Sequence, residues 1–141
     1  MNIKILGIDL SKHVFQLHGV DALGKAVLKK KLSREKVPEF IATLPSCRIV
    51  FEACGGANFW AREFKKMGHD VNIVSPQFVK PFVKGNKNDS NDAEAIVEAA
   101  SRPSMRYVSH KTIEQQDMQS LLRLRESCIK TRNIYFLIIK N

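Results

Sequence analysis

Ile3-Lys4-Ile5-Leu6-Gly7-Ile8-Asp9 is the stretch that decides the fold: a short apolar run that closes on a carboxylate. Such a run predicts a buried strand over residues 3–9. Residues 13–20 then alternate between apolar and polar side chains, and they meet residues 25–32 across Asp21-Ala22-Leu23-Gly24. Because that tetrapeptide is typical of a hairpin turn, the sequence predicts three consecutive strands at its start.

Helices and strands alternate in the rest of the chain. The predicted elements are a helix capped by Ser33 that runs through Leu44 (with Pro38 near its start), a strand over 48–53, a helix over 57–67, a short strand over 71–74, a helix over 92–100 and one long helix from Thr112 to the end. This order indicates an α/β fold with a mixed sheet flanked by helices. It is the order of the ribonuclease H-like fold, in which the first strand lies in the middle of the sheet.

Four acidic residues stand where carboxylates can converge on a metal. Asp9 closes the first apolar run, Glu52 closes Arg48-Ile49-Val50-Phe51, and Asp89 and Asp92 are three positions apart near a predicted helix start. One helical turn aims residues at this spacing the same way. Two-metal phosphoryl transfer needs several carboxylates, and Mg²⁺ prefers oxygen ligands. The sequence therefore predicts a catalytic site for Mg²⁺ or Mn²⁺ made of Asp9, Glu52, Asp89 and Asp92.

Each of these acids also has a simpler interpretation. Asp89 can be a helix N-cap, Asp92 can interact with the helix dipole, and Glu52 can face solvent at a strand end. Asp9 is harder to explain in this way, because a carboxylate after a buried apolar run is costly unless it has a partner. Taken together, the four residues favour the metal site.

The net charge of +9 favours a polyanionic partner, since each phosphate contact releases counterions. Charge alone does not separate nucleic acid from a membrane surface, but the acidic residues favour nucleic acid, and no stretch approaches the length of a membrane span. Lys12, Lys84 and Lys87 flank the acids in sequence and are predicted to contact phosphates, although ordinary solvated lysines are an equal alternative. Three scattered cysteines indicate reduced thiols in a cytoplasmic protein.

Three motifs together resemble one family. Gly7-Ile8-Asp9-Leu10-Ser11-Lys12, Phe51-Glu52-Ala53-Cys54-Gly55-Gly56 and Lys87-Asn88-Asp89-Ser90-Asn91-Asp92-Ala93 are similar to the N-terminal domain of the DEDD transposases and recombinases of the insertion-sequence-110 family. The resemblance implies a RuvC-like domain over residues 1–110. It also places the family's acidic tetrad on Asp9, Glu52, Asp89 and Asp92.

The same resemblance implies what surrounds this domain. Residues 111–141 are expected to begin a helical, coiled-coil-like segment, and the uncapped apolar run 134–139 leads us to expect a truncated chain or a last helix that packs on a partner. The missing C-terminal domain would supply a nucleophilic serine. DNA and an element-encoded guide RNA are the implied partners, the full-length protein is expected to form dimers or tetramers, and a bacterial or archaeal, nucleoid-associated location follows.

Three other functions remain open. A stand-alone nuclease that resembles Holliday-junction resolvases would keep the fold and the acids but use water as nucleophile. Gly7-Ile8-Asp9 with Ser11-Lys12 also superficially resembles the first phosphate loop of actin-like kinases, although the chain is short for two lobes. The third is a basic binding module without enzymatic activity, in which the acids are structural.

Overall fold

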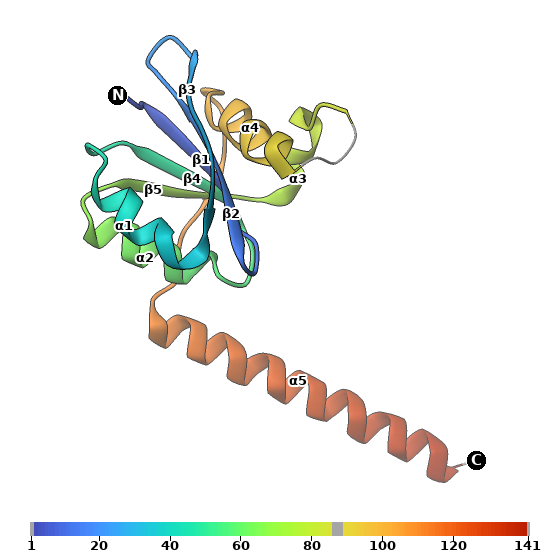
Figure 1. Ribbon diagram of the computed structural model, residues 1–141. Helices are drawn as coiled ribbons and strands as arrows, with labels where there is room; N and C mark the ends of the chain where they lie inside the picture. Colours follow the sequence, from blue (N-terminus) through green and yellow to red (C-terminus); the bar gives the residue numbers. More distant parts are fainter. Residues whose placement is uncertain (1, 86–88, 141) are drawn as a thin grey trace. The chain divides into compact units, whose positions relative to one another are not determined.

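The computed structural model describes residues 2–85 and 89–140, and the side chains of Asp89 and Ser90 lie outside this description. It divides into two compact units, Met1–His110 and Lys111–Asn141. The first unit contains a six-stranded sheet with helices on both faces (Figure 1). Within the described residues, none of the helices combines the length and apolar character that a membrane span requires.

Three strands form an antiparallel meander at the start of the chain. They are β1 (Ile5–Asp9), β2 (Val14–Val20) and β3 (Ala26–Ser33). The turn between β2 and β3 closes on Asp21, whose Oδ1 accepts hydrogen bonds from the backbone N–H groups of Leu23 (2.9 Å) and Lys25 (3.0 Å). Gly24 adopts φ 78°, a left-handed conformation that favours glycine. The predicted hairpin is confirmed.

The remaining strands extend the sheet on the other side of β1. β4 (Arg48–Glu52) pairs parallel with β1, β5 (Asp70–Val74) pairs parallel with β4, and β6 (Tyr107–Val108) pairs antiparallel with β5. The strand order is β3-β2-β1-β4-β5-β6. The prediction that the first strand lies mid-sheet is therefore confirmed, as is the mixed α/β fold.

Alternating side chains of the strands fill two separate cores. On one face, Leu6 and Ile8 of β1 and Phe51 of β4 are packed with α1 (Val37–Ala42) and α2 (Ala57–Lys66). On the other face, Val50 and Val74 lie against α4 (Asp89–Ala100). Between β5 and α4 the chain forms α3 (Pro76–Val79) and the 3₁₀ turn η2 (Lys80–Phe82). Figure 1 shows α1 and α2 on the opposite side of the sheet from α4.

Two local predictions were wrong. The helix expected from Ser33 to Leu44 is a 3₁₀ turn, η1 (Arg34–Lys36), followed by the short α1, and the Ser33 side chain makes no capping hydrogen bond. Pro38 explains the difference, because proline lacks an N–H and fits only the first turn of a helix, so α1 starts one residue before it. The helix predicted over residues 92–100 starts earlier than expected: it is α4, which begins at Asp89 rather than Asp92.

The long C-terminal helix is confirmed as α5 (Ile113–Lys140). Its start is capped reciprocally: the N–H of Thr112 donates to Oε1 of Gln115 (3.0 Å), and the N–H of Gln115 donates to Oγ1 of Thr112 (3.2 Å). No described residue of α5 is buried, and the exposed large apolar side chains include Leu121, Leu122, Tyr135, Phe136 and Ile139. Within its own unit, this helix leaves its apolar side chains uncovered.

Candidate active site

Asp9 and Glu52 end two neighbouring parallel strands. Ile8 of β1 is in register with Phe51 of β4, so the next residue on each strand stands side by side with the other. Ile8 and Phe51 are both buried in the core that faces α1 and α2. Because successive side chains alternate between faces, Asp9 and Glu52 project toward the α4 face, and both are partly buried.

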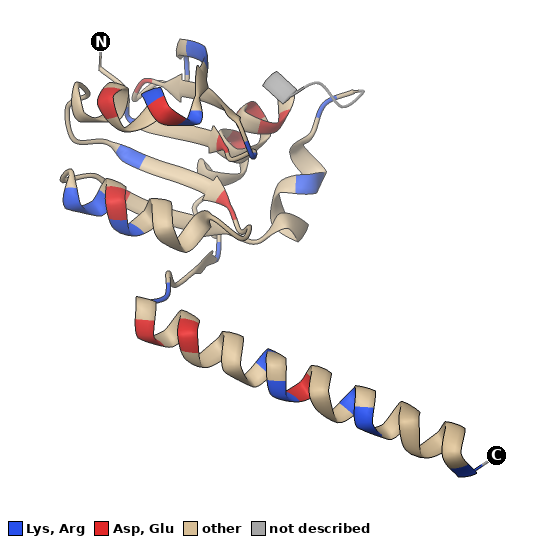
Figure 2. Cartoon of the chain, turned by 60° about the horizontal axis from the view of Figure 1, so that its bottom comes forward, with Lys and Arg blue, Asp and Glu red and all other residues tan. Residues whose placement is uncertain are grey.

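Gly7 lets α4 approach this end of the sheet. A Cβ atom at Gly7 would lie 2.6 Å from the carbonyl oxygen of Ala93 and 2.6 Å from Cγ2 of Val97. Only a residue without a side chain fits there, so the backbone of α4 lies directly against β1. Asp92, one residue before Ala93, is partly buried at this contact. In Figure 2 acidic positions (red) gather where the central strands end beside α4.

The electrostatics of Glu52 connect it to α4. Burial is the largest cause that raises the pKa of Glu52 above its ordinary value, and the negative charge of Asp92 raises it further. The positive charge of Lys80, at the start of η2, acts in the opposite direction. Glu52 and Asp92 therefore lie close enough to repel one another in a partly buried environment.

Asp89 occupies the first position of α4, but its side chain lies outside the described residues, so its contact with the other acids stays a prediction. Among the residues that the structure does describe, no three His, Cys, Asp or Glu side chains are grouped as a metal site would require. Thus Asp9, Glu52 and Asp92 occupy one end and one face of the sheet, and the described acids alone do not form a closed ligand set.

The three lysines predicted to contact phosphates have different surroundings. Lys12 is exposed between β1 and β2. Lys84 forms ion pairs with two acids on α4: its Nζ lies 3.8 Å from Oε1 of Glu94 and 3.7 Å from Oε2 of Glu98. Lys87 lies outside the described residues.

Sequence reasoning missed three polar residues near this end of the sheet. Lys80 acts on Glu52, and nothing in its sequence context distinguishes it from other exposed lysines. Gln16 is the register partner of Asp9, and Lys31 is the register partner of Gln16. The hairpin signal could have identified these last two, because a defined turn fixes the register of both strands.

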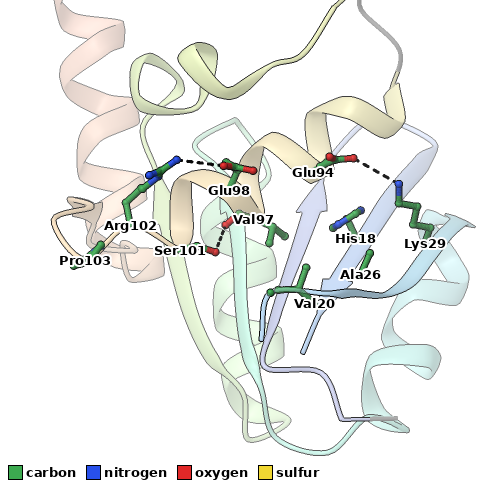
Figure 3. A pocket seen from close by; sticks show the side chains of 11 residues that line it. His18, Val20, Ala26, Lys29, Glu94, Val97, Glu98, Ser101, Arg102 and Pro103 are labelled. Atoms are coloured by element: carbon green, nitrogen blue, oxygen red, sulfur yellow. Dashed lines mark hydrogen bonds and ion pairs between the residues drawn. The ribbon is translucent and has the colours of Figure 1, made fainter. Parts of the chain in front are cut away.

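A separate cavity of about 490 Å³ lies farther along the same face, between the β2–β3 hairpin and α4 (Figure 3). His18 is buried beside it, and burial lowers the pKa of His18, with Glu94 raising and Lys29 lowering it in turn. Two ion pairs border the cavity, Lys29–Glu94 at 3.6 Å and Arg102–Glu98 at 3.2 Å. The charges that line this cavity thus largely neutralise each other.

Similar proteins agree with this architecture. The chain is 52% identical over 132 residues to a probable family 20 transposase of Pseudomonas aeruginosa, which covers 94% of this chain and 39% of the relative. It is 53% identical over 131 residues to the transposase for insertion sequence element IS1111A of Coxiella burnetii, which covers 93% of this chain and 36% of the relative. The chain therefore spans less than two fifths of the length of these two relatives.

The fold also occurs in a solved structure. T. thermophilus RuvC in complex with a Holliday junction substrate superposes with a TM-score of 0.52, at 12% identity, over 74% of this chain and 98% of the RuvC chain. This similarity confirms the predicted RuvC-like, ribonuclease H-like architecture. The protein-family model for the DEDD transposases of the insertion-sequence-110 type, described as "Transposase", matches residues 6–134 of this chain. Since that match covers nearly the whole chain, the protein belongs to the insertion-sequence-110 family of transposases.

Proposed function

We propose that this chain supplies the metal-binding part of a transposase that cleaves DNA and transfers strands. The observation that carries the proposal is the placement of Asp9, Glu52 and Asp92 at one end and on one face of the sheet, with Asp92 acting on the charge of Glu52. Asp9 would be the central ligand, Glu52 and Asp92 would flank it, and Asp89 at the start of α4 would be the fourth.

The residues fit a divalent metal. All are carboxylates, the oxygen ligands that Mg²⁺ and Mn²⁺ prefer. Burial and Asp92 both disfavour the charged form of Glu52, and a dication held between these carboxylates would offset that repulsion. When bound, the metal would stabilise the negative charge that develops at a scissile phosphodiester.

The lysines would hold neighbouring phosphates. Lys12 is exposed and follows Asp9 by three positions, which suits a contact beside the acids. Lys84 would exchange its ion pairs with Glu94 and Glu98 for a phosphate when nucleic acid binds. Lys87 is proposed for the same role from its sequence position.

The identity of the partners rests on the relatives and on charge. DNA is the substrate expected for a relative of insertion-sequence transposases, and the net charge of +9 suits a polyanion and a nucleoid location. An element-encoded guide RNA is proposed on the family resemblance. Assembly into dimers or tetramers is supported by the apolar side chains that α5 leaves exposed.

Calorimetric titration with Mg²⁺ and Mn²⁺ tests the proposal. The wild-type chain is compared with Asp9→Asn and with Glu63→Gln, a control on α2 at the other face of the sheet. We expect saturable binding in the wild type and the control, and none in Asp9→Asn. Equal binding in all three proteins, or none in any of them with DNA absent and present, would overturn the proposal.

The RuvC-like fold favours a second candidate, a nuclease that resolves branched DNA with water as the nucleophile. Incubating this chain with a four-way DNA junction and Mn²⁺ distinguishes the two functions. Cleavage that disappears in Asp9→Asn would favour the nuclease, while metal binding without cleavage would favour the transposase. A binding module with structural acids predicts that Asp9→Asn changes neither measurement. Membership of the transposase family leaves the actin-like kinase without support.

A further inference from the structure

A row of side chains crosses the sheet at the level of the acidic site. Asp9 on β1 is in register with Gln16 on β2, and Gln16 is in register with Lys31 on β3. Phe15 and Leu17, the neighbours of Gln16, are buried in the core on the α1–α2 face, so Gln16 points to the α4 face together with Asp9. The row therefore runs from the candidate metal ligand toward the edge of the sheet.

The direction of Lys31 follows from its two neighbours. Lys29 forms its ion pair with Glu94 of α4, whereas Nζ of Lys30 lies 4.4 Å from the ring centroid of Phe40 in α1. Since side chains of a strand alternate, Lys31 lies on the α4 face with Lys29. At about 4.8 Å per strand, its Cα atom is roughly 10 Å from that of Asp9.

A cavity joins these residues to the start of α4. It has a volume of about 240 Å³, and its lining includes Gln16, Lys30, Lys31 and Ala93. Ala93 directly follows Asp92 in α4, so this cavity continues from the acidic end of the site toward β3. β3 is an edge strand, so an elongated ligand bound in the cavity can extend past it into solvent.

Charge distinguishes Lys31 from the other cations near α4. Lys29, Lys84 and Arg102 all form ion pairs with Glu94 or Glu98, and Figure 3 shows Lys29 directed at Glu94. Lys31 is exposed, and among the described residues it has no ion pair. Lys30 also lines this cavity and has no ion pair among the described residues, but its Nζ lies over the ring of Phe40 on the α1 face. Lys31 is thus the cation on the α4 face of this cavity whose charge is available for an anion.

We propose that Lys31 and Gln16 bind a backbone phosphate of the nucleic-acid strand whose scissile group lies at the acidic site. The lysine supplies the charge, and the amide N–H₂ of Gln16 donates a hydrogen bond to a phosphate oxygen. A separation of roughly 10 Å places this phosphate within a few nucleotides of the scissile one. The inference rests on the proposed function, because it takes the acids as the place of cleavage.

Fluorescence anisotropy of a labelled single-stranded DNA oligonucleotide tests this contact with the 141-residue chain. Lys31→Gln is compared with Lys30→Gln, which removes the same charge from the next position on the opposite face of the sheet. Loss of one phosphate contact lowers the magnitude of the salt slope by about 0.7, which corresponds to about fivefold weaker binding at ~0.1 M salt. We expect this change in Lys31→Gln and less than about twofold weakening in Lys30→Gln, with thermal unfolding of both close to wild type. An RNA oligonucleotide of the same sequence forms the second arm, and an effect confined to one polymer identifies the strand that occupies the cavity.

Equal weakening in the two lysine variants, or no weakening in Lys31→Gln, would overturn the inference. Metal titration of Lys31→Gln without nucleic acid separates this failure from failure of the proposed function. Lys31 touches no metal ligand in the proposal, so its metal affinity should equal that of wild type, whereas Asp9→Asn should lose metal affinity. If the wild-type chain binds the oligonucleotide through Lys31 but binds no metal, the phosphate contact stands. Its connection to a site of cleavage would then be refuted.

Discussion

A Cβ atom at Gly7 would lie 2.6 Å from the carbonyl oxygen of Ala93. This contact sets the distance between the central strand and α4, and α4 carries Asp92 while β1 carries Asp9. A helix backbone cannot yield locally as a flexible side chain can, so any added atom must displace the helix as a whole. The separation of the two acids thus depends on a glycine that lies two residues before Asp9.

Gly7→Ala should therefore lower both the free energy of unfolding and the affinity for metal. Overpacking at this contact is expected to cost about 1–3 kcal/mol in the free energy of unfolding. Displacement of α4 should also weaken Mg²⁺ binding in calorimetry, since Asp92 moves with the helix. Gly55→Ala is the matched control, because a Cβ atom there would meet nothing within 4 Å. Wild-type metal affinity in a folded Gly7→Ala protein would show that the acids do not depend on this contact.

Asp92→Asn should stabilise the metal-free protein at neutral pH. The pKa of Glu52 is raised by burial and then by Asp92, so the contribution of Glu52 to stability falls as pH rises through its pKa. Removing the charge of Asp92 makes it easier to ionise Glu52 in the folded protein. The expected gain in the free energy of unfolding is less than about 1 kcal/mol, because both groups are partly exposed to solvent. Below about pH 4, where Glu52 is protonated in both proteins, the gain should vanish.

Urea unfolding at pH 7 and at low pH measures this difference. Asp70→Asn is the control: its Oδ2 lies 3.2 Å from Nε of Arg48 in an exposed ion pair, so its loss should change stability little or slightly reduce it. A destabilised Asp92→Asn protein at pH 7 would mean that Asp92 makes a favourable structural contact that outweighs its repulsion of Glu52.

Cys47 should resist thiol reagents that modify the other two cysteines. Burial raises the pKa of the Cys47 thiol to about 11, whereas Cys54 and Cys128 are exposed. Because the thiolate is the reactive form, labelling at pH 8 should reach Cys54 and Cys128 rapidly and Cys47 only after unfolding. The same shift predicts that stability declines as pH rises from about 9 toward 11, since the unfolded state loses this proton first. Mass spectrometry of partly labelled protein checks the order, and equal labelling of all three cysteines would contradict it.

His69 holds three segments together. Its Nε2–H donates to the carbonyl oxygen of Ile41 at 3.2 Å, and its Nδ1 accepts from the backbone N–H of Cys47 at 3.3 Å. His69→Ala leaves both buried backbone groups without this partner and should destabilise the protein by about 1–3 kcal/mol. His13→Ala, at an exposed position, should change stability by less than about 0.5 kcal/mol. Chemical denaturation of the two variants compares them directly.

The sequence predicted those parts of the fold that local chemistry determines. Asp21 and Gly24 form the expected turn because their hydrogen bonds and backbone angle need no distant partner. Asp9 and Glu52 stand at strand ends because each closes an apolar run. The early start of α4 and the short α1 were missed, since proline geometry at Pro38 and helix packing on β1 outweigh the simple spacing of apolar residues.

Features that depend on contacts across the sheet could not be predicted in the same way. β6 has two residues, too few for a periodic signal, and it exists because it pairs with the edge of β5. In the sequence, Gly7 does not differ from other glycines in strands. Its role follows only from the packing of α4 against it in the folded structure. The effect of Lys80 on Glu52 follows from packing, which no run of neighbouring residues encodes.

The central place of β1 in the sheet also determines the order in which the nascent chain can assemble. Its antiparallel partner β2 follows almost at once, but its parallel partner β4 begins only at Arg48, and α4 ends at Ala100. Pairings that are close in sequence form before distant ones, since the loop to be closed is shorter. While the chain is still on the ribosome, the β1–β2–β3 meander can already be complete. Val50 and Val74 stay uncovered until α4 has been synthesised. Its acids therefore come together last, so incomplete translation products would carry an exposed apolar sheet face and no assembled acidic site.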